Sequence, residues 1–376
     1  MQALLDFENE LIYAKNPVSY LEVRSGDLFR DGVCIGPATL LGKALELSPG
    51  SNFFPAWIGF VGYEYASYLG LTTHKPDGNF PDAAFFLFAS PAEEPHPGPL
   101  HPVERERERE LECRSLYERF DFLKSILAIQ GEIRAGDVYQ VNLSRQFELT
   151  GQKPNPFSVY HQLKQLHPSP FMGVLQHPDW SIVSGSPERL FKLHDGQIWT
   201  RPIAGTRPNS PTAEQDLLSN TKERAEHAML VDLMRNDLSK ICETGSVHIP
   251  EQFVIERYRH VLHLVSEVRG RTCADLSAVF KAIFPGGTIT GAPKENVMRS
   301  IKRHEPGPRG PYTGSFGYVS SRYGSDFNIL IRSLYIGRNK TYFSAGAGIV
   351  MGSNPEAEFE ETEHKIRQLK WVFPGN

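Results

Sequence analysis

The sequence predicts an α+β protein in which short strands outnumber helices. Apolar runs such as residues 56–66 (AWIGFVGYEYA) and 83–89 (AAFFLFA) lie between Gly and Pro residues and are typical of buried strands. Further strand-like runs follow residue 138, among them residues 327–337 (FNILIRSLYIG), and only three or four segments after residue 150 have helical apolar spacing. The sequence contains no internal repeat of fixed period, which disfavours a solenoid or a propeller.

The composition is that of an ordinary globular protein. The 376 residues are 40% hydrophobic, which is enough to bury a substantial core. The formal net charge of −4 offers no basic field, so we expect no nucleic-acid partner. The four cysteines are far apart and form no Cys-x-x-Cys pair, which disfavours a zinc site and a disulfide framework. No apolar stretch approaches the roughly 18 residues of a membrane span, so we expect a cytoplasmic protein without a membrane partner.

The segments can be assigned in order along the chain. Residues 1–90 contain strand-like runs, and residues 90–112, Pro-rich and then alternating in charge, are typical of an exposed linker. Apolar spacing predicts a helix over 117–135, followed by a strand at 138–149 (VYQVNLSRQFEL). We expect residues 1–110 to form a shortened amino-terminal region that packs on the same fold, and 111–376 to form the catalytic domain.

Residues 200–208 (TRPIAGTRP) place two prolines around a segment with little side-chain bulk. Such a segment is typical of a tight turn between strands. An alternative is that Ala204 leaves space for a small reactant.

Two predicted helices, which Asn220 and Asn354 are expected to cap, each carry a Glu-x-x-Glu pair. In the first, Glu223 and Glu226 share a face, and in the second, near the carboxyl end, Glu358, Glu361 and Lys365 line one stripe. Solvated acidic faces would explain both patterns. If the two helices converge, four carboxylates would need a divalent cation, and magnesium suits such oxygen ligands.

Seven stretches together resemble the chorismate-utilising enzymes. They are GDVYQVNLSRQFE, GSPERLF, RPIAGTRP, KERAEHAMLVDLMRND, HLVSEVRGR, FPGGTITGAPK, and AGAGIV followed by EAEFEET. The family includes anthranilate synthase component I, aminodeoxychorismate synthase component I, isochorismate synthase and salicylate synthase, and the match extends over about residues 120–369. The resemblance implies two packed antiparallel sheets with outer helices and an active site in the cleft between them.

The resemblance also implies roles for individual residues. Glu226 and Glu361 match the direct Mg²⁺ ligands, with Glu223 and Glu358 behind them or joined through water. Glu188 matches the general acid that protonates the departing C4 hydroxyl of chorismate. His263 matches a histidine beside the ring, which is a candidate base when pyruvate is eliminated.

A further set of residues matches the family's substrate-binding groups. Arg332 and Tyr318 resemble the groups that bind the enolpyruvyl carboxylate, a task suited to the planar guanidinium. Gly346 and Gly348 would let backbone N–H groups approach that carboxylate closely. The remaining matches add charge or line the cleft: Gly205, Thr206, Thr288 and Lys365.

The nucleophile is indicated by Gln140. Family members that add water have a lysine at the matching position, so Gln140 disfavours isochorismate and salicylate synthases and favours ammonia. In the family, ammonia comes from a glutamine amidotransferase. The chain contains no Gly-x-Cys-x-Gly motif, so we expect that partner to be a separate polypeptide.

Two branches of the family that use ammonia remain. Ala204 is typical of one branch, whereas the other motifs are more similar to the second. Aminodeoxychorismate synthases typically have lysine where Ala204 stands, whereas anthranilate synthases typically have alanine. YQVNLS, the doubled glycine of FPGGTITGAPK, and DFNILIR are more similar to aminodeoxychorismate synthases. The sequence is therefore most similar to aminodeoxychorismate synthases, which implies 4-amino-4-deoxychorismate as the product. Anthranilate synthase, a water-adding relative and a non-catalytic binding protein remain the alternatives.

Overall fold

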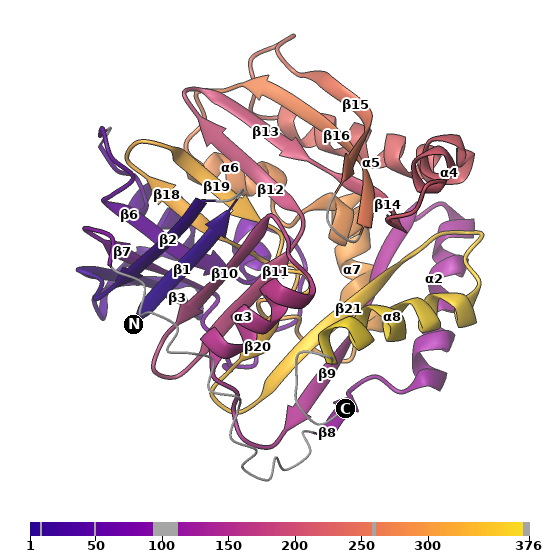
Figure 1. Ribbon diagram of the computed structural model, residues 1–376, viewed down its shortest axis with the longest axis horizontal. Coiled ribbons are helices and arrows are strands. Elements are labelled where there is room, and N and C mark those ends of the chain that lie inside the picture. The colour runs from indigo at the N-terminus through magenta and orange to yellow at the C-terminus, as the bar shows by residue number, and fades with distance from the viewer. Residues whose placement is uncertain (8–9, 49, 93–111, 258–260, 371–376) are drawn as a thin grey trace.

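The computed structural model describes residues 1–7, 10–48, 50–92, 112–257 and 261–370, and within them the strands form two antiparallel sheets (Figure 1). Each sheet is described by the order of its neighbouring strands. The first contains β17 (Gly291–Ala292), β9 (Gln140–Thr150), β21 (Thr341–Ile349), β20 (Leu334–Ile336), β11 (Ser181–Ser186), β10 (Phe171–Gln176), β1 (Gln2–Phe7) and β2 (Glu10–Lys15), with β8 (Glu112–Ser115) beside β9.

The second sheet is longer and carries the remaining described strands. Its order is β14 (Ile203–Pro208), β16 (Val261–Arg271), β13 (Gln197–Arg201), β12 (Arg189–His194), β19 (Gly324–Asn328), β18 (Ser315–Ser320), β6 (Ala56–Val61), β7 (Ala83–Phe88), β3 (Ser19–Arg24), β4 (Asp27–Arg30) and β5 (Val33–Pro37), with β15 (His248–Arg257) beside β16.

The longer helices pack on the outer faces of the sheets (Figure 1). On the first sheet, α8 (Pro355–Lys370) and α2 (Arg119–Ala135) cover β21, α3 (Pro156–Leu166) covers β10 and β11, and α7 (Lys294–His304) packs on β9. On the second, α4 (Ala213–Ser219) and α5 (Thr221–Ser239) pack on β14 and β16, and α6 (Leu276–Ile283) lies against α5. Short helices complete the described chain: α1 (Leu41–Ala44), η1 (Ala38–Leu40), η2 (Tyr63–Leu69) and η3 (Gly287–Ile289). The prediction of two packed antiparallel sheets with outer helices is confirmed.

The alternating side chains of the central strands explain why the sheets pack together. In β1, Leu5 and Phe7 face an aromatic core shared with Phe316 of the second sheet, whereas Leu4 faces a cluster under α3. Successive side chains of a strand point to opposite faces, so β1 contributes to both layers. Residues 1–90 contribute strands to both sheets. Strands β1 and β2 belong to the first sheet, and β3 to β7 belong to the second sheet. The predicted boundary at residue 110 lies outside the described residues.

Three local predictions were wrong. Six helices follow residue 150 in the described chain, more than the three or four expected, because short helices such as α3 and α6 resemble strand-sized apolar runs. The run FNILIRSLYIG, expected as one strand, is broken between β19 and β20, where Arg332 has a φ of 50°. The segment around Ala204 is not a turn but strand β14, with a register shift at Gly205, whose φ is 71°. No helix in the described part of the chain is long and apolar enough to cross a membrane.

Asn328 links the two sheets through a fully buried amide. Its Nδ2 donates to the carbonyl oxygen of Phe171 (3.1 Å) and to Ser184 Oγ (2.9 Å), both in the first sheet. Its Oδ1 accepts from the backbone N–H of Phe316 (3.0 Å) in the second sheet. Because buried polar groups need partners, this one side chain satisfies groups on both sheets.

We predict that Asn328→Ala lowers the free energy of unfolding by about 3 kcal/mol, since it leaves the buried backbone N–H of Phe316 unpaired and removes the hydrogen bonds to Phe171 and Ser184. Urea denaturation measures this loss, with the exposed Asn339→Ala as the control, which should change stability by less than about 0.5 kcal/mol. Equal stability of both variants would contradict the linking role.

Candidate functional site

A cavity of about 220 Å³ lies between the two sheets. The first sheet and α8 supply one wall, and the second sheet supplies the other. Fifteen residues line it: Asn142, Pro187, Glu188, Ile203, His263, Thr288, Ile289, Tyr312, Ile331, Arg332, Ser344, Ala345, Gly346, Lys365 and Leu369. Six of the residues predicted from the sequence are brought together here: Glu188, His263, Thr288, Arg332, Gly346 and Lys365.

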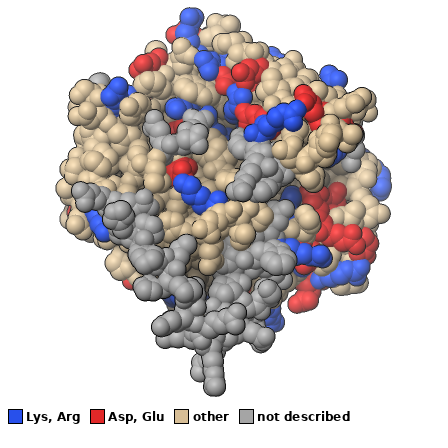
Figure 2. All heavy atoms as spheres, in the orientation of Figure 1, with Lys and Arg blue, Asp and Glu red and all other residues tan. Residues whose placement is uncertain are grey.

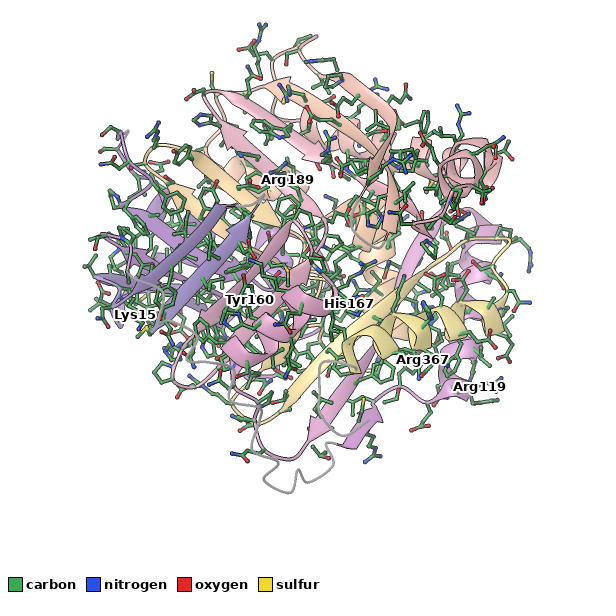
Figure 3. The ribbon with its side chains drawn as sticks, in the orientation of Figure 1. Lys15, Arg119, Tyr160, His167, Arg189 and Arg367 are labelled. Atoms are coloured by element: carbon green, nitrogen blue, oxygen red, sulfur yellow. The ribbon has the colours of Figure 1, made fainter. Side chains whose placement is uncertain are left out.

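Glu188 stands in the short loop between β11 and β12 and is buried. Burial raises the pKa of its carboxyl to about 7, while the positive charge of the Arg332 guanidinium acts in the opposite direction. The next residue, Arg189 (labelled in Figure 3), is fixed by a two-point ion pair with Asp326 of β19, at 2.9 Å for each nitrogen-to-oxygen contact. A carboxylic acid held at this point can donate a proton at neutral pH.

Arg332 is a half-buried cation whose guanidinium has no ion pair among the described residues. Burial lowers the pKa of the group, and Glu188 is the charge that opposes this effect. An uncompensated buried charge is costly unless a ligand neutralises it. The left-handed backbone of Arg332 is a further cost that is typical of functional positions. Both features favour an anionic ligand beside Arg332.

His263 lies in β16, opposite Thr206 of β14, and is buried. Burial lowers the pKa of its imidazole to about 4, and the nearby Arg332 contributes in the same direction. The ring is therefore neutral at neutral pH and has a lone pair with which it can accept a proton.

Lys365 brings a second cation to the cavity from α8. Its Nζ donates to the carbonyl oxygen of Gly346 (2.8 Å) and pairs with Glu361 (2.6 Å), one helical turn away. Gly346 is required by close packing, because a Cβ there would lie 2.3 Å from Asn142 Oδ1. Gly348 lies two residues further on, and a Cβ there would meet Gln140 Nε2 at 2.7 Å.

Several buried polar atoms around the cavity have no hydrogen-bond partner. Asn142 Oδ1 and Thr288 Oγ1 belong to residues that line it. Gln140 Oε1 and Glu223 Oε2 are buried and unpartnered in the neighbouring strand and helix. Because such atoms are rare in folded proteins, their concentration here favours a polar ligand.

The four predicted metal ligands lie on helices that flank different sheets. Glu223 and Glu226 are on α5, which packs on β14 and β16, and Glu358 and Glu361 are on α8, which packs on β21. Acidic side chains gather on the right of Figure 2, and α8 exposes Glu361.

The described side chains do not assemble a metal site in this arrangement. Among the residues that the structure describes, no three His, Cys, Asp or Glu side chains are close enough to hold one ion. Glu223 pairs with Arg207 at 2.8 Å, and Glu361 pairs with Lys365. The carboxylate donors suit Mg²⁺ chemically. Magnesium binding by Glu226 and Glu361 stays a prediction.

Other predicted residues lie outside the cavity lining. Tyr318 packs with the rings of Phe7 and Phe53 in the aromatic core, so its placement does not support the predicted contact with a ligand carboxylate. Ala204, Gly205, Gln140 and Gly348 are also absent from the lining. A Cβ at Gly205 would lie 3.0 Å from Glu223 Oε2, so this glycine makes room for that carboxylate. The side chain of Thr206 lies outside the described part of the structure.

The sequence analysis missed three polar residues of the lining. Asn142 lies two positions after Gln140 in a motif already recognised, so strand alternation could have placed both on one face. Ser344 directly precedes the AGAGIV motif. Tyr312 lies in a turn between α7 and β18, and no local pattern distinguishes it.

The fold and this cavity define a two-sheet protein with a site for an anionic ligand between the sheets. The chain belongs to the chorismate binding enzyme family, whose model matches residues 10–370.

Its relatives come from two branches of that family. The chain is 44% identical over 253 residues to aminodeoxychorismate synthase component 1 of Bacillus subtilis, with 65% of this chain and 53% of the relative covered. It is 42% identical over 246 residues to anthranilate synthase component 1 of Saccharolobus solfataricus, with 63% and 58% covered. The matches thus span little more than half the length of these relatives. The crystal structure of anthranilate synthase component I from Streptococcus pneumoniae has a TM-score of 0.82 and 30% identity, covering 96% of this chain and 91% of that one.

We predict that Glu188 makes folding stability fall as the pH rises. Between its ordinary pKa of 4.5 and its folded pKa of about 7, the unfolded chain ionises while the folded chain stays protonated. The resulting loss of about 3 kcal/mol is complete above the folded pKa and absent below pH 4.5.

Denaturation of wild type and Glu188→Gln across this pH range measures the effect, because the amide does not titrate. The exposed Glu360→Gln variant is the control and should follow wild type. A constant stability difference between wild type and Glu188→Gln would contradict the raised pKa.

Proposed function

We propose that this chain is the chorismate-converting component of an aminodeoxychorismate synthase, which makes 4-amino-4-deoxychorismate from chorismate and ammonia for p-aminobenzoate and folate synthesis. The observation that supports this substrate is the half-buried Arg332, which has no ion pair among the described residues, in one cavity with Glu188 and Lys365. Chorismate carries two carboxylates and a hydroxyl that must leave as water. Two cations and a protonated carboxylic acid suit these groups.

In the proposed reaction, Arg332 and Lys365 hold the carboxylates of chorismate. Glu188 donates its proton to the C4 hydroxyl, which leaves as water. Ammonia forms the new carbon–nitrogen bond and releases one proton, so that chorismate and ammonia yield the aminated product and water. Because residue 204 is alanine, no lysine amine is available there to attack the ring, and ammonia must be the nucleophile.

The branch is supported by motifs rather than by the cavity. Residues 139–144 (YQVNLS), the doubled glycine at 286–287 and residues 326–332 (DFNILIR) favour aminodeoxychorismate synthase. The ammonia would come from a glutamine amidotransferase on a separate chain, as in the relatives' family.

Anthranilate synthase is the second candidate, and a specific observation favours it. Ala204 is the residue typical of that branch, and the cavity also holds His263, the candidate base predicted from the sequence for the ring proton that is lost when pyruvate leaves. The same acid and anion-binding groups would serve both reactions.

Identification of the reaction product distinguishes aminodeoxychorismate synthase from anthranilate synthase activity. With chorismate, an ammonium salt and Mg²⁺, the purified chain is expected to form a compound that retains the enolpyruvyl group, as measured by mass spectrometry. Fluorescent anthranilate formed without an added lyase would establish the second candidate instead. Glu188→Gln should lower turnover by at least about 100-fold, because general acid catalysis contributes that much.

Magnesium dependence is tested separately. If the two glutamate pairs close on one ion together with the substrate, Glu226→Gln and Glu361→Gln should each weaken Mg²⁺ binding by at least about tenfold. Calorimetric titration of Mg²⁺ with chorismate present measures this, and the exposed Glu360→Gln on the same helix is the control. Unchanged binding in both variants would remove these residues from the metal site.

A further inference from the structure

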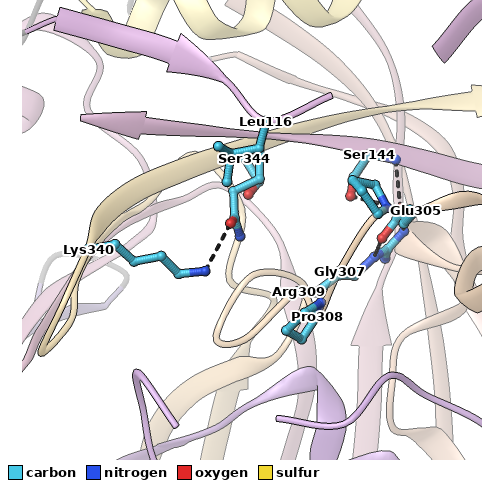
Figure 4. Close-up of a pocket in the computed structure, with 10 residues that line it drawn as sticks. Leu116, Ser144, Glu305, Gly307, Pro308, Arg309, Lys340 and Ser344 are labelled. Atoms are coloured by element: carbon cyan, nitrogen blue, oxygen red, sulfur yellow. Dashed lines mark hydrogen bonds and ion pairs between the residues drawn. The ribbon is translucent and has the colours of Figure 1, made fainter. Parts of the chain in front are cut away.

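Arg309 and Glu305 form a buried ion pair that has no part in the proposed chemistry. Both side chains are almost fully buried. The contact is two-pronged, with Arg309 Nε 2.9 Å from Glu305 Oε2 and Arg309 Nη2 2.7 Å from Glu305 Oε1. The pair follows α7 and lies beside a second cavity of about 280 Å³ (Figure 4). Ser344 lines both cavities, so the second cavity adjoins the candidate active site.

The remaining N–H groups of Arg309 reach the walls of the candidate active site. Nη2 donates to the carbonyl oxygen of Asn142 (2.7 Å), and Nη1 donates to the carbonyl oxygen of Ile289 (3.0 Å). Nη1 also donates to Thr313 Oγ1 (3.1 Å), next to Tyr312. Asn142, Ile289 and Tyr312 all line the chorismate cavity, and they come from β9, η3 and the turn before β18. One guanidinium therefore joins three separate segments of the wall.

Further hydrogen bonds and a ring contact hold the ion pair of Arg309 and Glu305 in place. Glu305 Oε1 accepts hydrogen bonds from both the backbone N–H and the hydroxyl of Ser144, each at 2.8 Å (Figure 4). The carboxylate of Glu64 accepts from the backbone N–H groups of Arg309 (2.8 Å) and Gly310 (2.9 Å). The guanidinium also lies over the ring of Tyr63, 4.8 Å from its centre.

We propose that Arg309 is a positioning residue for the chorismate cavity, holding the main chain at Asn142 and Ile289 so that the Asn142 and Thr288 side chains face the ligand. Oδ1 of Asn142 and Oγ1 of Thr288 are the two unpartnered atoms in the lining. The inference rests on the proposed function and adds to it a determinant of ligand placement. Arginine is needed because its planar guanidinium donates hydrogen bonds in several fixed directions at once. The ammonium group of a buried lysine at this position can reach fewer acceptors.

The test compares Arg309→Lys with Lys294→Met. Lys294 forms another buried ion pair, with Asp237 at 2.8 Å, and donates to the carbonyl oxygen of Ile283 at 2.7 Å. Neither Asp237 nor Ile283 lines the cavity, so this control removes a buried pair without touching the wall. For each variant, the dissociation constant of chorismate is measured by calorimetry with Mg²⁺ present, together with the thermal midpoint.

For Arg309→Lys we expect chorismate binding to weaken by about tenfold or more, as displaced wall groups lose their alignment. For Lys294→Met we expect a lower thermal midpoint but a dissociation constant within about twofold of wild type. Equal binding by wild type and folded Arg309→Lys would overturn the inference. Failure of wild type to bind chorismate would overturn the proposed function instead.

Glu305→Gln provides the second variant in case Arg309→Lys does not fold. The amide keeps the shape and the acceptor for Ser144 but removes the charge that anchors Arg309. We expect chorismate binding to weaken by about threefold or more, consistent with loss of a charge-assisted contact. Wild-type binding by folded Glu305→Gln would equally overturn the inference.

Discussion

The site depends on one constraint, which is that an acid and a cation are held together, shielded from water, between two sheets. These groups are Glu188 and Arg332, which line one cavity. Desolvation raises the pKa of Glu188 to about 7 and lowers the pKa of Arg332. Either condition would be lost if the cavity opened widely to solvent, because water would stabilise both charged forms. The packing of the sheets is therefore part of the chemistry, and buried links such as Asn328 contribute to it.

The groups at the site stand where regular structure is interrupted. Arg332 follows the end of β19 with a left-handed backbone, Glu188 lies in the loop between β11 and β12, and Gly205 interrupts the pairing of β14. Continuous strands would direct successive side chains to alternate faces and could not bring these groups to one point. Side chains donate hydrogen bonds to main-chain groups in this part of the structure. Arg309 donates two of these bonds, to the carbonyl oxygens of Ile289 and Asn142.

The two candidate products share most of this machinery, which explains why the relatives come from both branches at similar identity. An acid for the leaving hydroxyl and cations for the carboxylates are needed in either reaction. In the motif comparison the two branches differ at position 204, which lies in β14. Ile203, rather than Ala204, lines the cavity in this arrangement, so the alanine alone does not settle the product.

Several features follow from the sequence because they are local or lie within recognisable motifs. The strand-rich class, the helix α2, and the caps of the two glutamate-bearing helices are of this kind, since Asn220 and Asn354 accept the expected backbone N–H groups at 3.0 and 3.1 Å. Motif matching also selected Glu188, His263, Arg332 and Lys365, which the structure brings to one cavity.

Tertiary structure alone decided which neighbours of those residues reach the cavity. It placed Tyr318 in an aromatic core, brought Tyr312 and Asn142 to the lining, and packed the two glutamate-bearing helices on different sheets. The physical reason is that motif spacing determines which residues share a strand or helix face. The relative position of faces on different sheets depends on packing and buried hydrogen bonds between segments far apart in the chain.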